Sequence, residues 1–156
     1  MSKVRSIVVG TGGIARCHIG AMLDMKRTTS IVGFVEPSEA SRTATAALFS
    51  EKGIACPPFH ATVRELIEAE GAVDAAVICT PHKFHFENAK DCLLSGMDVL
   101  IEKPMVMNGA EARRLIDLRN KSGRLVMVAF PGSLSPAIWK AKQMLAQGAI
   151  GEVSSI

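Results

Sequence analysis

Residues 7–15 read Ile7-Val8-Val9-Gly10-Thr11-Gly12-Gly13-Ile14-Ala15, an apolar run that breaks into glycines and then resumes as a predicted helix. Gly10 would allow the tight exit from a strand, Gly12 would let the backbone approach a pyrophosphate, and Ala15 would let the helix pack close to the strand. The N-terminal N–H groups of the helix would then face the anion. The pattern therefore predicts a phosphate-binding turn, the alternative being an ordinary strand, turn and helix.

An acidic residue follows at the position that a dinucleotide site requires, about 20 residues further on. Glu36 ends the second apolar run, Ile31–Val35. A carboxylate there can accept hydrogen bonds from both hydroxyls of an adenosine ribose but would repel a 2′-phosphate. The sequence thus predicts a dinucleotide site that prefers NAD to NADP, with Arg42 in the following helix as a residue that could swing toward a phosphate.

Length and composition favour a single α/β domain. The chain has 156 residues, enough for a sizeable core. Its residues are 48% hydrophobic but only 4% aromatic, so small aliphatic side chains dominate, as suits helices packed closely on a sheet. The net charge of +3 comes from 18 basic and 15 acidic residues spread along the chain. Because no basic stripe is present, we expect no nucleic-acid partner.

The cysteine pattern and the hydropathy predict an intracellular protein without a membrane segment. Cys17, Cys56, Cys79 and Cys92 are widely spaced and form no Cys-x-x-Cys pair. Neither a disulfide framework nor a thiolate zinc site is indicated, so we expect reduced thiols and a cytoplasmic location. Glycines and an arginine interrupt the N-terminal apolar run that could imitate a signal peptide, and no run is long enough to span a membrane.

Apolar runs alternate with helical spacings along most of the chain. Strands are predicted at 4–9, 30–35, 73–80, 98–101 and 125–129, with a short, proline-limited strand within 54–59. The helices between them are predicted to end near Met25, Gly53, Gly71, Gly96 and Gly123. Six parallel strands with crossover helices on both faces make a doubly wound sheet, the Rossmann fold, which binds ligands at the carboxyl ends of its strands.

Residues 130–156 differ from the alternating pattern. A loop at 130–136, a helix at 137–147 and a turn at 148–151 precede residues 152–156, which look like the beginning of a strand. We therefore expect 1–129 to form the dinucleotide-binding domain. Residues 130–156 would lead into a second domain that this chain does not contain.

Polar features gather at strand ends on one edge of the predicted sheet. They are the glycine turn, Glu36, Thr80–His85 and Glu102–Pro104. Lys103 follows a buried strand, where it could hydrogen-bond a substrate hydroxyl or help to move its proton, whereas the alternative is an ordinary surface lysine.

Two other histidine and cysteine patterns are given no role. Cys79, His82 and His85 recur every third residue, but a strand-to-helix placement is poor geometry for a metal site, and a buried Cys79 would be an inert nucleophile. We therefore predict no metal. His18 lies within the first helix and is assigned no chemistry, since a lone helical histidine is more often a satisfied polar residue.

Five motifs together are specific. They are Gly10-x-Gly12-Gly13-x-Ala15, Glu36-Pro37, Thr80-Pro81-x-x-x-His85, Glu102-Lys103-Pro104 and Gly148-Ala149-Ile150-Gly151-Glu152-Val153. With these motifs essentially the whole chain resembles the Gfo/Idh/MocA family of NAD(P)-dependent oxidoreductases. The resemblance implies a dehydrogenase that transfers a hydride between nicotinamide and a hydroxyl-bearing carbon of a sugar, inositol or related compound.

The resemblance also implies roles for individual residues. The pyrophosphate would be held by Gly10, Thr11, Gly12, Gly13 and Ile14, and the adenosine ribose by Glu36. The nicotinamide side would be lined by Thr80, Pro81 and His85. Lys103 would be the catalytic residue beside the nicotinamide and the reacting hydroxyl, and Glu102 would orient it.

Family members have a second α/β domain that forms the substrate pocket, supplies an Asp-x-x-x-His pair and commonly mediates homo-oligomers. The resemblance therefore implies that this chain alone is inactive. Residues 130–136, Phe130-Pro131-Gly132-Ser133-Leu134-Ser135-Pro136, depart from the arginine and aromatic found there in many members, so the substrate stays open. The alternative function is a stand-alone regulatory module that binds a dinucleotide, or SAM in its place, without catalysis.

Overall fold

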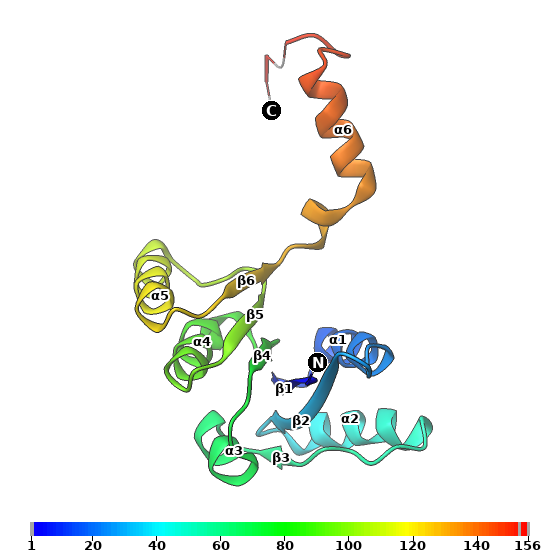
Figure 1. Ribbon diagram of the computed structural model, residues 1–156, viewed down its shortest axis with the longest axis vertical. Coiled ribbons are helices and arrows are strands. Elements are labelled where there is room, and N and C mark those ends of the chain that lie inside the picture. Colours follow the sequence, from blue (N-terminus) through cyan, green and yellow to red (C-terminus); the bar gives the residue numbers. More distant parts are fainter. Residues whose placement is uncertain (1, 153, 156) are drawn as a thin grey trace.

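The computed structural model describes residues 2–152 and 154–155, and its centre is one parallel sheet (Figure 1). The six strands lie in the order β3-β2-β1-β4-β5-β6. They are β1 (Val4–Val9), β2 (Thr29–Val35), β3 (Phe59–His60), β4 (Ala75–Ile78), β5 (Asp98–Glu102) and β6 (Val126–Ala129). The doubly wound parallel sheet predicted from the sequence is confirmed, and its strand order reverses direction between β1 and β4.

A helix lies between each pair of successive strands, and one more follows β6 among the described residues. The helices are α1 (Gly13–Asp24), α2 (Glu39–Glu51), α3 (Val63–Glu70), α4 (His85–Leu94), α5 (Gly109–Ser122) and α6 (Pro136–Ala146). Two short 3₁₀ turns, η1 (His82–Phe84) and η2 (Pro131–Leu134), occupy segments that the sequence leaves as loops.

The sheet carries a separate apolar core on each face. On one face, Ile19 of α1 and Phe49 of α2 pack onto Val8, Phe34 and Val77. The helices α3, α4 and α5 cover the opposite face and contribute buried apolar side chains to a second cluster (Figure 1). Burial of each large side chain is worth roughly 1.5–3 kcal/mol, so these two layers fix the sheet and the loops at its edges.

The third strand is shorter and later than the sequence predicts. Residues 54–59 are expected to contain it, but β3 is Phe59–His60. Pro57 and Pro58 have no N–H to donate to a sheet ladder. The Pro58 carbonyl can still accept, and it does so from the N–H of Phe34 at 2.9 Å. Regular pairing therefore begins only after the prolines.

The chain leaves the body of the fold after β6. The helix α6 stands away from the sheet and contributes no buried residue (Figure 1). The strand expected to begin within 152–156 falls partly on residues 153 and 156, which lie outside the described residues, while 152, 154 and 155 are not in a strand. Among the described residues, no helix is both long and apolar enough to cross a membrane.

Candidate functional site

The turn after β1 is pressed against the segment that follows β4. Gly10 has a φ of +82°, and a Cβ at this position would lie 2.9 Å from the N, Cα and Cγ2 atoms of Thr80. The Gly10 N–H also donates to the Val35 carbonyl at 2.8 Å. Backbone conformation and space therefore both require glycine at residue 10.

The other two glycines of the turn face open space. A Cβ on Gly12 or Gly13 would meet no atom within 4 Å, and the φ of Gly12 is an ordinary −65°. Neither a left-handed backbone angle nor a neighbouring atom requires glycine at these two positions. An added side chain would fill the space directly in front of the turn.

The N-terminus of α1 has no side-chain cap and no acidic residue in its first turn. By contrast, α2, α3 and α5 are capped by Ser38, Thr62 and Asn108, whose side chains accept from backbone N–H groups. The first N–H groups of a helix need a partner from outside the helix. At α1 they are available to an anion, which is how helix N-termini bind phosphate.

Glu36 is buried at the end of β2, with only 7% of its surface exposed. Its Oε2 accepts from the Thr11 N–H at 2.8 Å and from the Thr11 hydroxyl at 3.2 Å, and its Oε1 accepts from the Ser38 N–H at 2.8 Å. The Arg42 Nε–H donates to the Glu36 backbone carbonyl. The carboxylate therefore ties the glycine turn to β2 and keeps its remaining lone pairs for a ligand.

These residues enclose a cavity at the carboxyl edge of the sheet. It has a volume of about 610 Å³ and is lined by Gly10, Gly12, Gly13, Ile14, Glu36, Ser38, Ser41 and the segment Cys79–His82. A second cavity of about 340 Å³ shares Gly10, Glu36, Thr80 and Pro81 with it. Cavities of this size are typical of small-molecule and cofactor sites.

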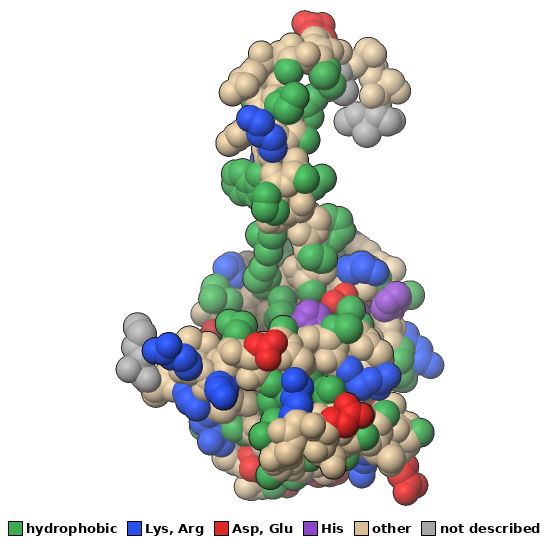
Figure 2. All heavy atoms as spheres, turned by 90° about the vertical axis from the view of Figure 1, so that its right-hand side faces the viewer, with side chains coloured by type: hydrophobic (Ala, Val, Ile, Leu, Met, Phe, Trp, Pro, Cys, Tyr) green, Lys and Arg blue, Asp and Glu red, His purple; other side chains and the backbone are tan. Residues whose placement is uncertain are grey.

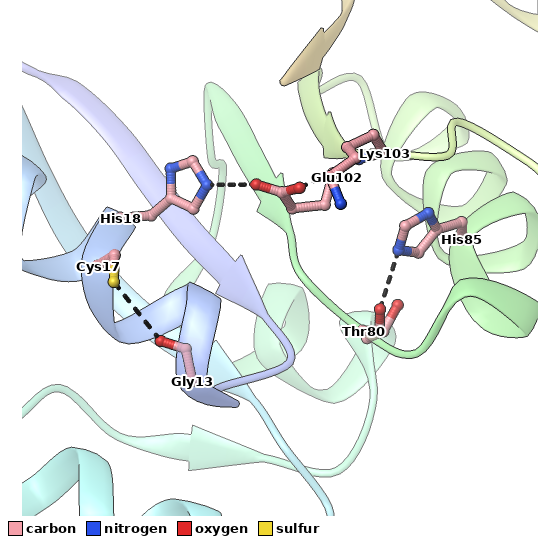
Figure 3. Close-up of polar contacts among 7 residues, drawn as sticks. All are labelled: Gly13, Cys17, His18, Thr80, His85, Glu102 and Lys103. Carbon is pink, nitrogen blue, oxygen red and sulfur yellow. Dashed lines mark hydrogen bonds and ion pairs between the residues drawn. The ribbon is translucent and has the colours of Figure 1, made fainter. Parts of the chain in front are cut away.

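His85 connects the segments that follow β4 and β5, and Figure 3 shows its contact with Thr80. Its Nε2 lies 2.9 Å from the Thr80 carbonyl oxygen and its Nδ1 lies 2.7 Å from the Pro104 carbonyl oxygen. Carbonyl oxygens only accept, so both contacts are hydrogen bonds only when each ring nitrogen carries a proton. His85 is fully buried and therefore lies behind the cavity wall, whereas its neighbour His82 lines the cavity.

Glu102 ends β5 and is held by donors on both of its oxygens. His18 Nε2 lies 2.9 Å from Oε1, and the Lys103 N–H donates to Oε2 at 3.1 Å (Figure 3). Burial alone would raise the pKa of this carboxyl. The hydrogen bonds from His18 and Lys103, together with their positive charges, outweigh burial and lower the Glu102 pKa below its ordinary value. The carboxyl group is therefore an anion near neutral pH.

Lys103 is exposed, and its peptide bond to Pro104 is cis. Figure 3 shows Glu102 and Lys103 between His18 on one side and Thr80 and His85 on the other. Lys103 thus lies at the same edge of the sheet as the cavity but is not one of the lining residues.

The predicted site residues divide into three groups. Lining the cavity are Gly10, Gly12, Gly13, Ile14, Glu36, Thr80 and Pro81. Thr11 and His85 are buried behind its walls, and Glu102 and Lys103 lie beside it at the end of β5. Among the described residues, no three histidine, cysteine or acidic side chains gather closely enough to hold a metal ion.

His18 is a satisfied polar residue, as the sequence predicts, but its partner Glu102 was not predicted. It shares a helix face with Ala15, Ile19 and Met22, all of which pack toward the sheet. An inward-facing polar residue among apolar ones was the available signal. Its partner could not be read locally, because Glu102 is 84 positions away in sequence.

Parallel strands, a glycine turn, an uncapped helix N-terminus and an acidic residue after β2 define a dinucleotide-binding domain of the Rossmann class. The family model described as "Oxidoreductase family, NAD-binding Rossmann fold" matches residues 4–130. The chain belongs to this family, Gfo/Idh/MocA, and forms its NAD-binding part.

Curated relatives include two sugar or polyol dehydrogenases. Inositol 2-dehydrogenase 1 of Saccharopolyspora erythraea is 29% identical over 150 residues, which cover 96% of this chain and 43% of that protein. D-xylose 1-dehydrogenase (NADP(+)) of Hypocrea jecorina is 30% identical over 155 residues, covering 94% of this chain and 39% of that protein. The chain therefore spans less than half the length of these relatives.

Solved structures show the same fold. Scyllo-inositol dehydrogenase from Lactobacillus casei, with bound NAD(H) and scyllo-inositol, superposes with a TM-score of 0.81 at 19% identity, covering 98% of this chain and 44% of that one. The WlbA dehydrogenase from Bordetella pertussis, in complex with NADH and UDP-GlcNAcA, gives a TM-score of 0.81 at 24% identity, covering 94% of this chain and 43% of that one.

Proposed function

We propose that this chain is the cofactor-binding part of an NAD-dependent dehydrogenase that acts on a hydroxyl-bearing carbon of a sugar, inositol or related compound. The observation that carries the proposal is the uncapped N-terminus of α1, which meets a cavity of about 610 Å³ beside the buried Glu36. Inositol and xylose dehydrogenases among the relatives support the substrate class.

The residues of the cavity fit an extended dinucleotide. Backbone N–H groups at Gly12, Gly13 and Ile14 would hold the pyrophosphate, because no side chain of the helix competes for them. Glu36 would accept hydrogen bonds from the adenosine ribose with the lone pairs that Thr11 and Ser38 leave free.

We propose NAD as the preferred cofactor. A 2′-phosphate would be brought against the Glu36 carboxylate and repelled. Arg42 is the cation closest in sequence that could offset this repulsion, but its Nε–H is engaged by the Glu36 carbonyl. Moving Arg42 to a phosphate would break that hydrogen bond.

The nicotinamide, when bound, supplies the hydride chemistry. The protein positions the cofactor and the substrate and polarises the reacting oxygen. Thr80 and Pro81 would form the wall on the nicotinamide side, braced from behind by His85. The Lys103 ammonium would donate a hydrogen bond to the reacting oxygen, and Glu102 would orient it. The substrate pocket would belong to a second domain that would follow residues 130–156.

Free thiols at Cys17, Cys56, Cys79 and Cys92 fit a cytoplasmic location.

Isothermal titration with NAD, NADP and SAM tests this function without a substrate. We expect NAD to bind about tenfold or more tightly than NADP, and SAM not to bind. Gly12→Val should abolish NAD binding while keeping the fold, because its methyl groups would occupy the open space in front of the turn.

Gly20→Ala, on the same helix but away from the turn, is the matched control and should bind NAD normally. Unchanged NAD affinity in Gly12→Val would contradict the phosphate site, and tighter binding of NADP would contradict the cofactor preference. Binding of SAM alone would contradict the dehydrogenase function.

A further inference from the structure

A histidine and a carboxylate meet across the fold at the end of β5. His18 comes from α1, whereas Glu102 ends β5, yet Nε2 and Oε1 lie 2.9 Å apart. The side chains are 26% and 14% exposed, so both are largely shielded from water. A contact of this kind is worth more than an exposed surface pair, which side-chain entropy and solvent screening weaken.

The direction of the hydrogen bond follows from the charge on Glu102. Since this carboxyl is an anion, its oxygens can only accept. Nε2 of His18 must therefore carry the proton. With His18 on Oε1 and the Lys103 N–H on Oε2, one carboxylate joins the helix α1 to the backbone of the residue that we propose acts at the reacting oxygen.

The helix that carries His18 is also the helix whose N-terminus faces the cavity. Gly13 begins α1, and His18 follows within its second turn. A displacement of α1 would therefore reach the Lys103 segment through one side-chain hydrogen bond. The same link would oppose movement of Lys103 away from a ligand held on α1.

We propose that His18 is a positioning residue, which fixes the Glu102 carboxylate and the Lys103 backbone relative to the phosphate-binding helix. It thereby holds the part of the site that would bind the nicotinamide at a fixed position relative to the part that would bind the pyrophosphate. This inference rests on the proposed function, because it assumes that the dinucleotide spans from α1 to the end of β5.

The test compares NADH with ADP-ribose, which has the same adenosine and pyrophosphate but no nicotinamide. His18→Phe removes the donor, and His18→Gln keeps an N–H at a similar distance from the backbone. In His18→Phe we expect roughly fivefold weaker binding of NADH, as for loss of one hydrogen bond. ADP-ribose affinity should change by less than about twofold. His18→Gln should restore most of the NADH affinity.

Cys17→Ala is the matched control, because Cys17 is the exposed neighbour of His18 on the same helix and its thiol donates a long hydrogen bond, at 3.8 Å, to the Gly13 carbonyl. Both ligands should bind this variant as they bind the wild type. The control separates a general disturbance of α1 from loss of the hydrogen bond to Glu102.

A spectroscopic readout reports the link in the absence of ligand. The amide proton of Lys103 donates to Glu102, so its NMR shift should follow the titration of that carboxyl. In His18→Phe the midpoint should move to higher pH, because a donor that lowers the Glu102 pKa is lost. His18→Gln should reverse part of this movement.

The outcomes separate the inference from the function. Equal losses for NADH and ADP-ribose in His18→Phe, or an unmoved Lys103 titration, would overturn the positioning role while NAD binding by the wild type still supported the function. Failure of the wild-type chain to bind either ligand would overturn the proposed function and, with it, this inference.

Discussion

Two glycines in one turn serve different purposes, although the sequence motif presents them alike. At Gly10 the backbone angle is left-handed and Thr80 leaves no room for a Cβ, whereas at Gly12 the angle is ordinary and the space is open. Gly10 is thus a requirement of the fold, whereas Gly12 would be a requirement of the proposed ligand. A motif in sequence does not distinguish the two.

Gly10→Ala should therefore destabilise the protein even without a ligand. A non-glycine residue in the left-handed region costs of order 1–3 kcal/mol, and contact with the Thr80 backbone adds to that cost. Urea denaturation followed by circular dichroism measures the change in free energy of unfolding. Gly20→Ala, within α1 and free of contacts at its Cβ, should instead stabilise by about 0.5–1 kcal/mol. A Gly10→Ala variant as stable as wild type would contradict the close approach of the two turns.

The four cysteines should differ in reactivity by burial. Burial raises the pKa of Cys79 and of Cys92 to about 12, with the charges of Glu102 and Asp91 adding to the effect. Cys17 is exposed and Cys56 is partly exposed. Thiol titration with a disulfide reagent at pH 8 should modify Cys17 rapidly and Cys56 more slowly. Cys79 and Cys92 should react only after denaturation.

The same burial predicts a loss of stability at alkaline pH. In the unfolded chain these two thiols ionise near the ordinary cysteine pKa of 9.0, while in the folded chain they stay protonated until about pH 12. The unfolded state therefore binds fewer protons between these values, and the free energy of unfolding should fall as pH rises. Reaction of all four thiols at one rate in the native protein would contradict this picture.

The sequence singled out both the glycine turn and the two histidines, but it did not supply the distant contacts that His85 and His18 make. The glycines and Glu36 carry their signal within one unit of strand, turn, helix and strand, β1 to β2. His85 contacts the Pro104 carbonyl, 19 positions away in sequence, and His18 contacts Glu102, 84 positions away. Which side chains meet at the edge of a sheet follows from strand order and register, which a local pattern does not specify.

At the scale of elements, α6 contributes no buried residue to the core. Its apolar residues Ile138, Trp139, Met144 and Leu145 are exposed, and Trp139 is 57% exposed. Figure 2 shows hydrophobic side chains along the segment that projects from the body. A helix with an unburied apolar face gains little from packing and offers a surface for association.

Deletion of residues 131–156 should leave the rest of the fold intact. None of the described residues in 131–156 is buried, so we expect the free energy of unfolding to change by less than about 0.5 kcal/mol. Urea denaturation monitored by circular dichroism measures this change. Light scattering should also show less self-association than in the full chain. A large loss of stability would mean that α6 contributes to the core after all.

The third strand shows what element-level prediction can and cannot supply. Alternation of apolar runs and helical spacings located every long strand and helix, because buried parallel strands and amphipathic helices have distinct periods. The segment 54–60 has no such period. Its two prolines limit strand pairing to Phe59–His60. The first residue of β3 depends on which carbonyl group accepts the hydrogen bond from the N–H of Phe34 in β2.

At the scale of the whole molecule, Lys103 lies at the same edge of the sheet as the cavity but outside the cavity that the described residues form there. The cavity is formed by segments that follow β1, β2 and β4, and Lys103 at the end of β5 is exposed. Orientation of substrate against a cofactor supplies much of the rate acceleration of a bimolecular reaction, so a lysine alone is not sufficient.

The chain by itself should therefore bind NAD but not turn over polyols. We expect its melting temperature to rise with NAD concentration, as for any ligand that binds the native state. NADH formation from inositol or xylose should stay at the background rate. Turnover that is abolished in Lys103→Ala would show instead that this domain holds a complete active site.

The missing side-chain cap of α1 also has a consequence for motion. Ser38, Thr62 and Asn108 complete the first turns of their own helices, whereas the first turn of α1 has no such partner. Its leading amides should fray and exchange with deuterium faster than those of α2 in the free protein. A bound pyrophosphate would accept hydrogen bonds from these amides and stop the fraying. The dinucleotide would therefore complete the first turn of the helix. Deuterium uptake at residues 13–16 should therefore slow when NAD is added, while uptake at residues 109–112, in the capped first turn of α5 and outside the cavity lining, stays unchanged.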